Sequence, residues 1–317
     1  LNALLIESAN DAALAIAKHI AGSVEEFAKL MNEKAKAIGA LNTNFVNPNG
    51  LPHEAHVTTA YDLALMAKYA MENETFRSVV KNYTYTIPVT NKKSQERVLW
   101  SSNRLLYSTE KINVDGVQKS IKYEGVNGVK SGYTVAAGQC LVTSYEKDGH
   151  KLIAVVLKSS GKNIYSDTHK LLNYGINNFE KVKVGYANKF VDNFQVDNGV
   201  IPYVAGITKS DSFYIVQKGK ANSIEERITK NDLEAPISKD EVIGKVEYYL
   251  DGKKISETDI IATMDVELMP TPTFMDKVKS KWYLFVFALL FLIRLWNLSR
   301  IRRRRYKRRR SSTLFGT

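Results

Sequence analysis

The sequence contains very little cysteine and histidine, and this scarcity excludes several classes of site. Cys140 is the single cysteine among 317 residues, so these residues offer neither an internal disulfide nor a cysteine cluster for zinc. It lies in an alternating apolar stretch, which is typical of a small core residue. The two histidines of HEAH at 53–56 are three residues apart. The zinc-protease helix motif needs histidines four apart, so we predict no metal and no cofactor.

Acidic residues are absent from positions 299–317, and the positive charge of the chain is concentrated there. The formal net charge is +12, and nine arginines and lysines lie between Arg300 and Arg310. The rest of the chain therefore carries only about +3. A nearly balanced body does not favour a nucleic-acid surface, and we predict no nucleic-acid partner.

Long apolar runs are also scarce, apart from WYLFVFALLFLIRLWNL at 282–298. A full span needs about 20 residues, so this run is slightly short. A helix lying flat in the interface would show polar residues at nearly every turn, and Trp282–Ile293 is uninterrupted. We therefore predict a transmembrane or membrane-anchor helix. By the positive-inside rule, the basic tail at 299–317 is cytoplasmic, and residues 1–280 lie on the extracellular face of the cell membrane.

Helical and strand-like patterns are segregated along the remaining chain. Helical patterns come first, and Ser23 with Glu26 forms a capping-box signature at the start of one of them. Strand-like alternation follows, including a hairpin joined around Asp148–Gly149. Residues 1–180 are predicted to form an α+β domain in which helices flank an antiparallel sheet. Residues 181–268 are predicted to form a small all-β domain, and residues 269–281 are predicted to form a proline-containing linker.

The stretch GVNGVKSGYTVAAGQC at 125–140 places Lys130 between glycines and directly before Ser131, Gly132 and Tyr133. Glycines allow a ligand to lie close to the main chain, while the ammonium and the hydroxyl can receive its polar end. The alternative is a glycine-rich turn with a solvated lysine.

A second polar pair stands near the start of the sequence, where Ser8 and Asn10 are separated by one residue. In an extended break, side chains two residues apart point the same way and can face one space. The alternative is an ordinary helix cap at either residue.

Three stretches, in this order and spacing, resemble the serine D-alanyl-D-alanine carboxypeptidases. These are low-molecular-mass penicillin-binding proteins of the penicillin-binding-protein-5 type, in peptidase family S11. Their signatures are Ser-x-x-Lys, a Ser-Asp-Asn type motif and Lys-Thr-Gly. Ser8-Ala9-Asn10 matches the second signature, and Lys130-Ser131-Gly132 matches the third with a serine that keeps the hydroxyl. The stretches begin SANDAALAIAKHIAGS, FVNPNGLPHEAHVTTAYDL and GVNGVKSGYTVAAGQC.

The resemblance implies a β-lactamase/DD-peptidase-like domain, a substrate and a set of roles. The substrate would be a peptidoglycan stem peptide ending in D-Ala-D-Ala, and β-lactam antibiotics would bind in its place. Lys130 would supply the positive field, Ser131 would bind the terminal carboxylate, and Tyr133 would lend a backbone N–H to the oxyanion hole. Ser8 would relay a proton to the leaving amine, while Asn10 would hold the catalytic lysine and the substrate amide.

The first signature is missing, because no Ser-x-x-Lys precedes Ser8. SSNR at 101–104 and SYEK at 144–147 are in the wrong place, and the latter sits on the predicted hairpin. We therefore expect a peptidase domain that is incomplete at its N-terminus, with the nucleophile upstream of Leu1. Residues 1–317 alone should be inert in acyl transfer.

Two other functions stay open at this point. One is a non-catalytic cell-wall binding protein that keeps the groove without the nucleophile. The other is a β-lactamase, for which Glu54 would be the candidate deacylating base. The predicted β domain and membrane helix favour the peptidase over the β-lactamase.

Overall fold

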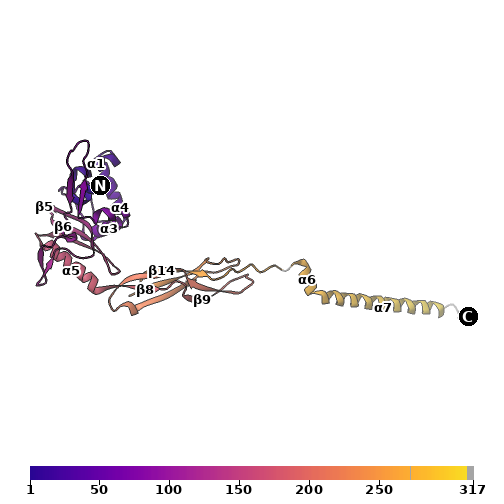
Figure 1. Cartoon of the computed structure of the whole chain (residues 1–317). Helices are drawn as coiled ribbons and strands as arrows, with labels where there is room; N and C mark the ends of the chain where they lie inside the picture. Colours follow the sequence, from indigo (N-terminus) through magenta and orange to yellow (C-terminus); the bar gives the residue numbers. More distant parts are fainter. Residues whose placement is uncertain (272, 313–317) are drawn as a thin grey trace. The chain divides into compact units, whose positions relative to one another are not determined.

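The computed structural model describes residues 1–271 and 273–312, and for 277–278 and 304–312 the description is limited to the backbone. The described chain divides into two compact units (Figure 1). The first consists of residues 1–184, 213–225 and 250–253, and the second of residues 185–212, 226–249 and 254–317.

The helices of the first unit begin where the sequence offers caps. Ser23 Oγ accepts the backbone N–H of Glu26 at 3.0 Å, while the Glu26 carboxylate pairs with Lys29 instead of closing the expected capping box. Thr59 Oγ1 caps its helix through the N–H of Asp62. The helices are η1 (Ala3–Glu7), α1 (Asn10–Ala21), α2 (Val24–Ala37), α3 (Ala60–Met71), α4 (Glu74–Val80), η2 (Arg104–Leu106) and α5 (Asn163–Asn178).

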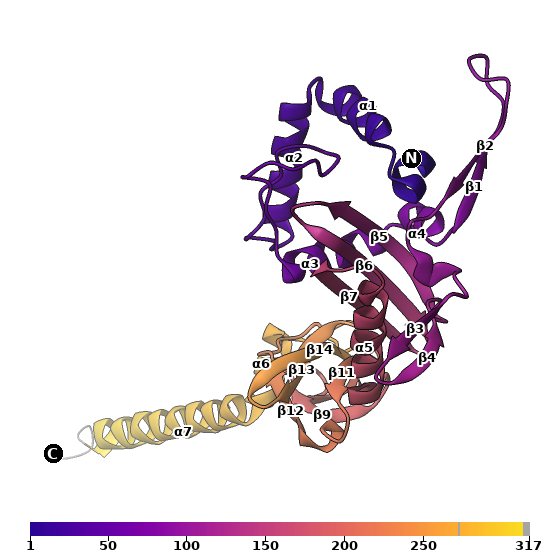
Figure 2. The same cartoon turned by 90° about the vertical axis from the view of Figure 1, so that its left-hand side faces the viewer.

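The sheet of the first unit is antiparallel, in the order β5-β6-β7. Its strands are β5 (Val126–Thr134), β6 (Gly138–Lys147) and β7 (His150–Ser159). Lys147 pairs with His150 across a two-residue loop in which Asp148 and Gly149 both have positive φ, the turn that matches strand twist. The predicted hairpin is therefore confirmed. Helix α5 packs against this sheet, as Figure 2 shows, and α3 contacts β6 and β7.

Two small hairpins complete this unit. They are β1 (Thr84–Ile87) with β2 (Arg97–Trp100), and β3 (Lys111–Val114) with β4 (Val117–Ser120). The β3–β4 hairpin, η2, the sheet and α5 contribute to one apolar core that contains Leu105, Ile121, Leu141 and Ile164. This core fixes the sheet against the loop at 101–103 and against the first turn of α5.

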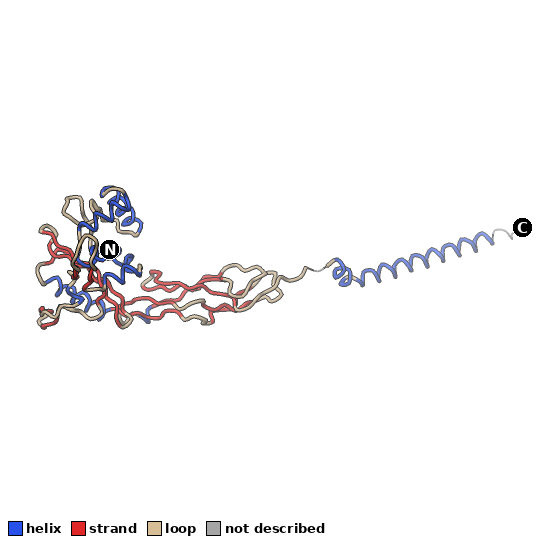
Figure 3. The backbone as a smooth tube through the Cα atoms, turned by 45° about the horizontal axis from the view of Figure 1, so that its top comes forward, coloured by secondary structure: helices blue, strands red, loops and turns tan. Residues whose placement is uncertain are grey.

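Strands predominate in the second unit, as the predicted all-β character requires (Figure 3). Its sheet has the order β12-β13-β14-β10-β9, whereas β8 pairs with β11 in a two-stranded sheet that falls almost entirely within the first unit. The strands are β8 (Phe179–Gly185), β9 (Phe190–Gln195), β10 (Tyr203–Thr208), β11 (Ser212–Gln217), β12 (Ile224–Lys230), β13 (Val242–Leu250) and β14 (Lys253–Ala262). Inward side chains such as Phe194, Ile243, Tyr248 and Ile260 form the core.

The C-terminal segment is more helical than expected. The segment predicted as a linker at 269–281 contains α6 (Phe274–Ser280). Helix α7 (Trp282–Ser312) continues from the apolar run into the predicted tail, and 313–317 lie outside the described residues. Arginine and lysine are good helix formers, and no proline or glycine interrupts 282–312, so the helix does not end at residue 298.

Among the described residues, one helical stretch is long and apolar enough to cross a membrane. It runs from Trp282 to Arg303, with a mean hydropathy of 1.8, and none of its residues is buried. At 1.5 Å per residue it is about 33 Å long, which suits a hydrocarbon core of ~30 Å.

Candidate active site

A pocket of about 260 Å³ gathers polar side chains from segments that are distant in the sequence. It lies at β5, beside the end of η1, the loop at 101–103 and the first turn of α5. Its lining residues are Ser8, Ser102, Lys130, Ser131, Gly132, Tyr133, Gln139, Leu141, Ile164 and Tyr165. The structure thus places Ser8 in one pocket with the whole Lys130–Tyr133 segment.

Strand β5 supplies most of the polar lining because it is an edge strand. Its single sheet partner is β6, with Lys130 opposite Val142 and Gly132 opposite Cys140. Gly132 has open space where a Cβ would lie, so a ligand can approach the backbone there. Tyr133 also lines the pocket and is 64% exposed.

Lys130 carries the unusual charge of this site. Its Nζ donates to the Ser131 carbonyl oxygen at 2.9 Å and to Ser102 Oγ at 3.4 Å, both neutral acceptors. No carboxylate forms an ion pair with it among the described residues. Burial therefore lowers the pKa of Lys130 from 10.5 to about 8. A half-buried ammonium without a counter-ion is a site prepared for an anion.

Ser131 and Ser102 form the second polar feature of the pocket. The Ser131 hydroxyl donates to Ser102 Oγ at 2.6 Å. This bond links β5 to the loop at 101–103, which continues from β2. The Lys130 side chain ends at the same oxygen, so the ammonium and both hydroxyls belong to one hydrogen-bonded group.

The predicted pair at residues 8 and 10 is divided by the backbone. Ser8 adopts a left-handed conformation, with φ 68° and ψ 37°, and is the residue after η1. Asn10 is exposed, begins α1, and is not among the pocket's lining residues. The expectation of an extended break over residues 8–10 is therefore wrong, because Ser8 is left-handed and Asn10 already begins α1, which leaves Ala9 extended between them.

Ser-x-x-Lys spacings occur elsewhere in the chain, and none of them provides a serine to this pocket. They begin at Ser78, Ser108, Ser144 and Ser159. None of these serines is a lining residue. The pocket likewise has no carboxylate in its lining, and Glu54 is an exposed loop residue outside it.

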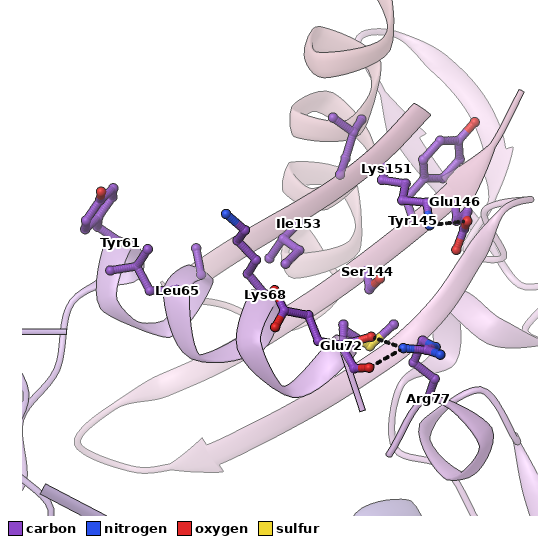
Figure 4. A pocket seen from close by; sticks show the side chains of 13 residues that line it. Tyr61, Leu65, Lys68, Glu72, Arg77, Ser144, Tyr145, Glu146, Lys151 and Ile153 are labelled. Carbon is purple, nitrogen blue, oxygen red and sulfur yellow. Dashed lines mark hydrogen bonds and ion pairs between the residues drawn. The ribbon is translucent and has the colours of Figure 1, made fainter. Parts of the chain in front are cut away.

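A larger cavity of about 900 Å³ lies between α3 and strands β6 and β7 (Figure 4). Its most prominent cation, Arg77, is already committed, because its Nη1 donates to the carbonyl oxygens of Met71 and Glu72 at 2.6 and 2.8 Å. Lys151 pairs with Glu146. None of the predicted site residues, Ser8, Asn10 and Lys130–Tyr133, lines this cavity, so its size does not identify the site of chemistry.

Sequence reasoning missed three polar residues of the pocket, namely Ser102, Gln139 and Tyr165. The triplet Ser101-Ser102-Asn103 has the Ser-x-Asn form, but it stands between the recognisable motifs instead of in their order. Contacts of η2 with β5 place it beside Lys130. Gln139 entered the pocket in the same way, through its pairing with Tyr133.

Known proteins resemble this chain over both of its parts. Residues 1–161 match the family model described as D-alanyl-D-alanine carboxypeptidase, peptidase S11. Residues 179–268 match the model for the C-terminal domain of penicillin-binding protein 5.

The curated relatives carry the same name. D-alanyl-D-alanine carboxypeptidase DacF of Bacillus subtilis is 31% identical over 290 residues, which cover 90% of this chain and 70% of the relative. DacC of Escherichia coli is 31% identical over 276 residues, and DacA of Haemophilus influenzae is 30% identical over 271 residues. Each of these two matches covers 83% of this chain, but only 62% of DacC and 63% of DacA.

Solved structures agree with these matches. Penicillin-binding protein 5 of Haemophilus influenzae has a TM-score of 0.61 at 29% identity, covering 84% of this chain and 73% of that one. Penicillin-binding protein 3 of Streptococcus pneumoniae has a TM-score of 0.65 at 22% identity, covering 84% of this chain and 76% of that one, and it supports the fold alone. The predicted fold class, an α+β penicillin-binding domain followed by an all-β domain, is confirmed, and the chain belongs to the D-alanyl-D-alanine carboxypeptidase family of serine peptidases.

Proposed function

We propose that this chain forms the substrate-receiving part of a serine D-Ala-D-Ala carboxypeptidase that removes the terminal D-alanine from peptidoglycan stem peptides. One observation carries the proposal: Lys130 is a half-buried ammonium bonded only to neutral oxygens, in a pocket that also contains Ser8 and Ser131. A peptide that ends in a carboxylate supplies the missing anion. β-Lactam antibiotics, which also carry a carboxylate, are proposed to occupy the same pocket.

The proposed reaction proceeds through an acyl-enzyme. A serine hydroxyl attacks the carbonyl between the two D-alanines, an ester bond forms, and the C–N bond breaks as the leaving amine takes a proton relayed by Ser8. Water then hydrolyses the ester and restores the serine. Lys130 and the hydrogen-bonded hydroxyls of Ser131 and Ser102 hold the carboxylate of the leaving residue. The Tyr133 N–H stabilises the oxyanion, a contribution of about 3 kcal/mol per donor. Asn10 is proposed to hold the catalytic lysine of the Ser-x-x-Lys signature, so its role depends on the segment that carries that lysine.

The nucleophile is proposed to lie in a segment before Leu1. The composition of the pocket supports this proposal, because no serine of a Ser-x-x-Lys spacing lines it. The proposed domains are the peptidase domain at 1–180 and the all-β domain at 181–268. The proposed anchor is the helix beginning at 282, with residues 1–280 outside the cell membrane and the basic tail at 299–317 in the cytoplasm.

Covalent labelling by a fluorescent penicillin tests the proposal. A longer protein that includes a Ser-x-x-Lys segment before Leu1 should be labelled, whereas residues 1–317 alone should not. Lys130→Ala in the longer protein should lower the labelling rate about a hundredfold or more, since the loss includes a charged hydrogen bond and the pocket's positive field. Labelling of residues 1–317 would place the nucleophile within this chain and overturn the assignment.

A non-catalytic cell-wall binding protein is the second candidate, and the same absence of a nucleophile from the pocket favours it. Such a protein would bind D-Ala-D-Ala peptides reversibly through Lys130 and Ser131 without labelling in any form. A β-lactamase lacks support, because Glu54 lies outside the pocket and no carboxylate lines it.

A further inference from the structure

Ser102 occupies the centre of the polar group in the pocket. Its Oγ accepts a hydrogen bond from Ser131 Oγ at 2.6 Å and another from Lys130 Nζ at 3.4 Å. The residue is exposed and lines the pocket. It lies on the loop after β2, in a different segment from the two residues that donate to it.

The hydrogen-bonding capacity of a hydroxyl determines what Ser102 can still do. A serine oxygen has two lone pairs and one O–H. Lys130 and Ser131 together use both lone pairs, so Ser102 has only its O–H to offer to a further partner. That O–H must point away from both donors, and a group that enters the pocket is its available acceptor. Ser102 can therefore donate a hydrogen bond to an anion, but it cannot accept one from a further N–H group.

The loop at 101–103 holds this hydroxyl in place. The Tyr107 hydroxyl donates to the Ser101 carbonyl oxygen at 3.2 Å. The Asn103 N–H donates to Ser101 Oγ at 3.2 Å, and Asn103 Oδ1 accepts the N–H of Leu105. Ser101 and Asn103 are both buried, so the exposed residue between them is fixed on either side. Such a preorganised donor loses little entropy when a ligand binds.

We propose that Ser102 supplies the hydroxyl donor to the substrate's terminal carboxylate beside Lys130, since Ser131 uses its only O–H on Ser102, and that Ser102 makes the site select an acid over the corresponding amide. A carboxylate oxygen accepts the Ser102 O–H while the ammonium balances its charge. A terminal amide has no negative charge and one acceptor oxygen instead of two. When that oxygen accepts from Lys130, the amide NH₂ meets the Ser102 O–H, and neither group is an acceptor. This inference rests on the proposed function, because it assumes that the pocket takes a peptide terminus.

Reversible binding tests the inference without any need for a nucleophile. Residues 1–317, solubilised in detergent, are titrated calorimetrically with acetyl-D-alanyl-D-alanine and with its C-terminal amide. Ser102→Ala should weaken binding of the acid about tenfold, as expected for one charge-assisted hydrogen bond, and should leave the amide within about twofold. Ser102→Thr keeps the hydroxyl and should restore most of the affinity for the acid.

Two further variants separate the possible outcomes. Tyr107→Phe removes a loop contact without touching the Ser102 hydroxyl, so it controls for loop disturbance and should preserve the ratio between acid and amide. If Lys130→Ala abolishes acid binding while Ser102→Ala leaves it unchanged, or weakens acid and amide equally, Ser102 is no carboxylate ligand although the proposed function stands. If the unaltered chain binds neither compound, the proposed function and this inference both fall.

Discussion

At the level of single residues, the site depends on a lysine whose charge is poorly compensated. Lys130 donates to the Ser131 carbonyl and to Ser102 Oγ, and neither acceptor bears a charge. Burial penalises the ammonium, which is why the pKa of Lys130 is lowered to about 8. A bound carboxylate would offset that penalty. The Lys130 ammonium is therefore less stable in the empty pocket than in the pocket occupied by a carboxylate.

The lowered pKa predicts a pH dependence for carboxylate binding. Lys130 is mostly charged below its pKa of about 8 and loses the proton above it, so affinity should be steady at lower pH and should fall as pH rises. The expected decrease between about pH 7 and pH 9 is roughly tenfold, measured by titrating acetyl-D-alanyl-D-alanine into the chain.

Lys130→Arg is the matched control, because a guanidinium remains charged throughout this range. Whatever its absolute affinity, that variant should bind the acid with little change between pH 7 and pH 9. The same decrease in both proteins would show that a group other than Lys130 titrates.

At the level of secondary-structure elements, strand β5 positions the site through two glycines with different surroundings. Gly128 has φ +152°, and a Cβ there would lie 2.8 Å from Val80 Cγ2 on α4. Gly132 has ordinary backbone geometry, and a Cβ there would meet nothing within 4 Å. The first glycine permits close packing of strand on helix, whereas the second leaves the pocket open.

These surroundings predict that one alanine variant loses stability and the other loses affinity for the ligand. Gly128→Ala should lower the free energy of unfolding by ~1–3 kcal/mol, since a methyl group would overlap a buried valine, and the midpoint of urea unfolding measures this. Gly132→Ala should leave that midpoint nearly unchanged while weakening binding of acetyl-D-alanyl-D-alanine. Equal stability losses in both variants would refute the distinction.

At the level of the whole molecule, a pocket-bearing α+β unit and an all-β unit precede a long apolar helix. The stretch Trp282–Arg303 is unburied within the described chain. Residues 304–310 add a concentration of arginine and lysine, and no acid follows. An apolar span followed by a basic segment favours insertion with the basic end in the cytoplasm.

A truncated chain tests this arrangement. A variant that ends at residue 268 should appear in the soluble fraction after cell lysis, whereas the chain with α7 should stay with membranes through an alkaline carbonate wash. Trypsin added to intact protoplasts should degrade the part before α7 if that part is extracellular. Retention of the truncated variant on membranes would show that a segment other than α7 anchors the chain.

Local patterns in the sequence were sufficient for much of the architecture. The caps at Ser23 and Thr59, the Asp148–Gly149 turn and the apolar run at 282 each depend on neighbours within a few residues, and local interactions determine their conformation. The Lys130–Tyr133 motif was equally readable, because glycines around a lysine and a serine indicate close approach to a backbone.

Contacts between distant segments could not be derived in this way. Ser8 is left-handed where η1 ends, and Asn10 begins the next helix, so the break is shorter than the sequence suggested. The position of Ser102 beside Lys130 spans 28 residues and depends on how the core around Leu105 and Leu141 closes. Local chemistry predicts which groups are present, but their convergence in one pocket follows from long-range burial of apolar side chains, which no short stretch encodes.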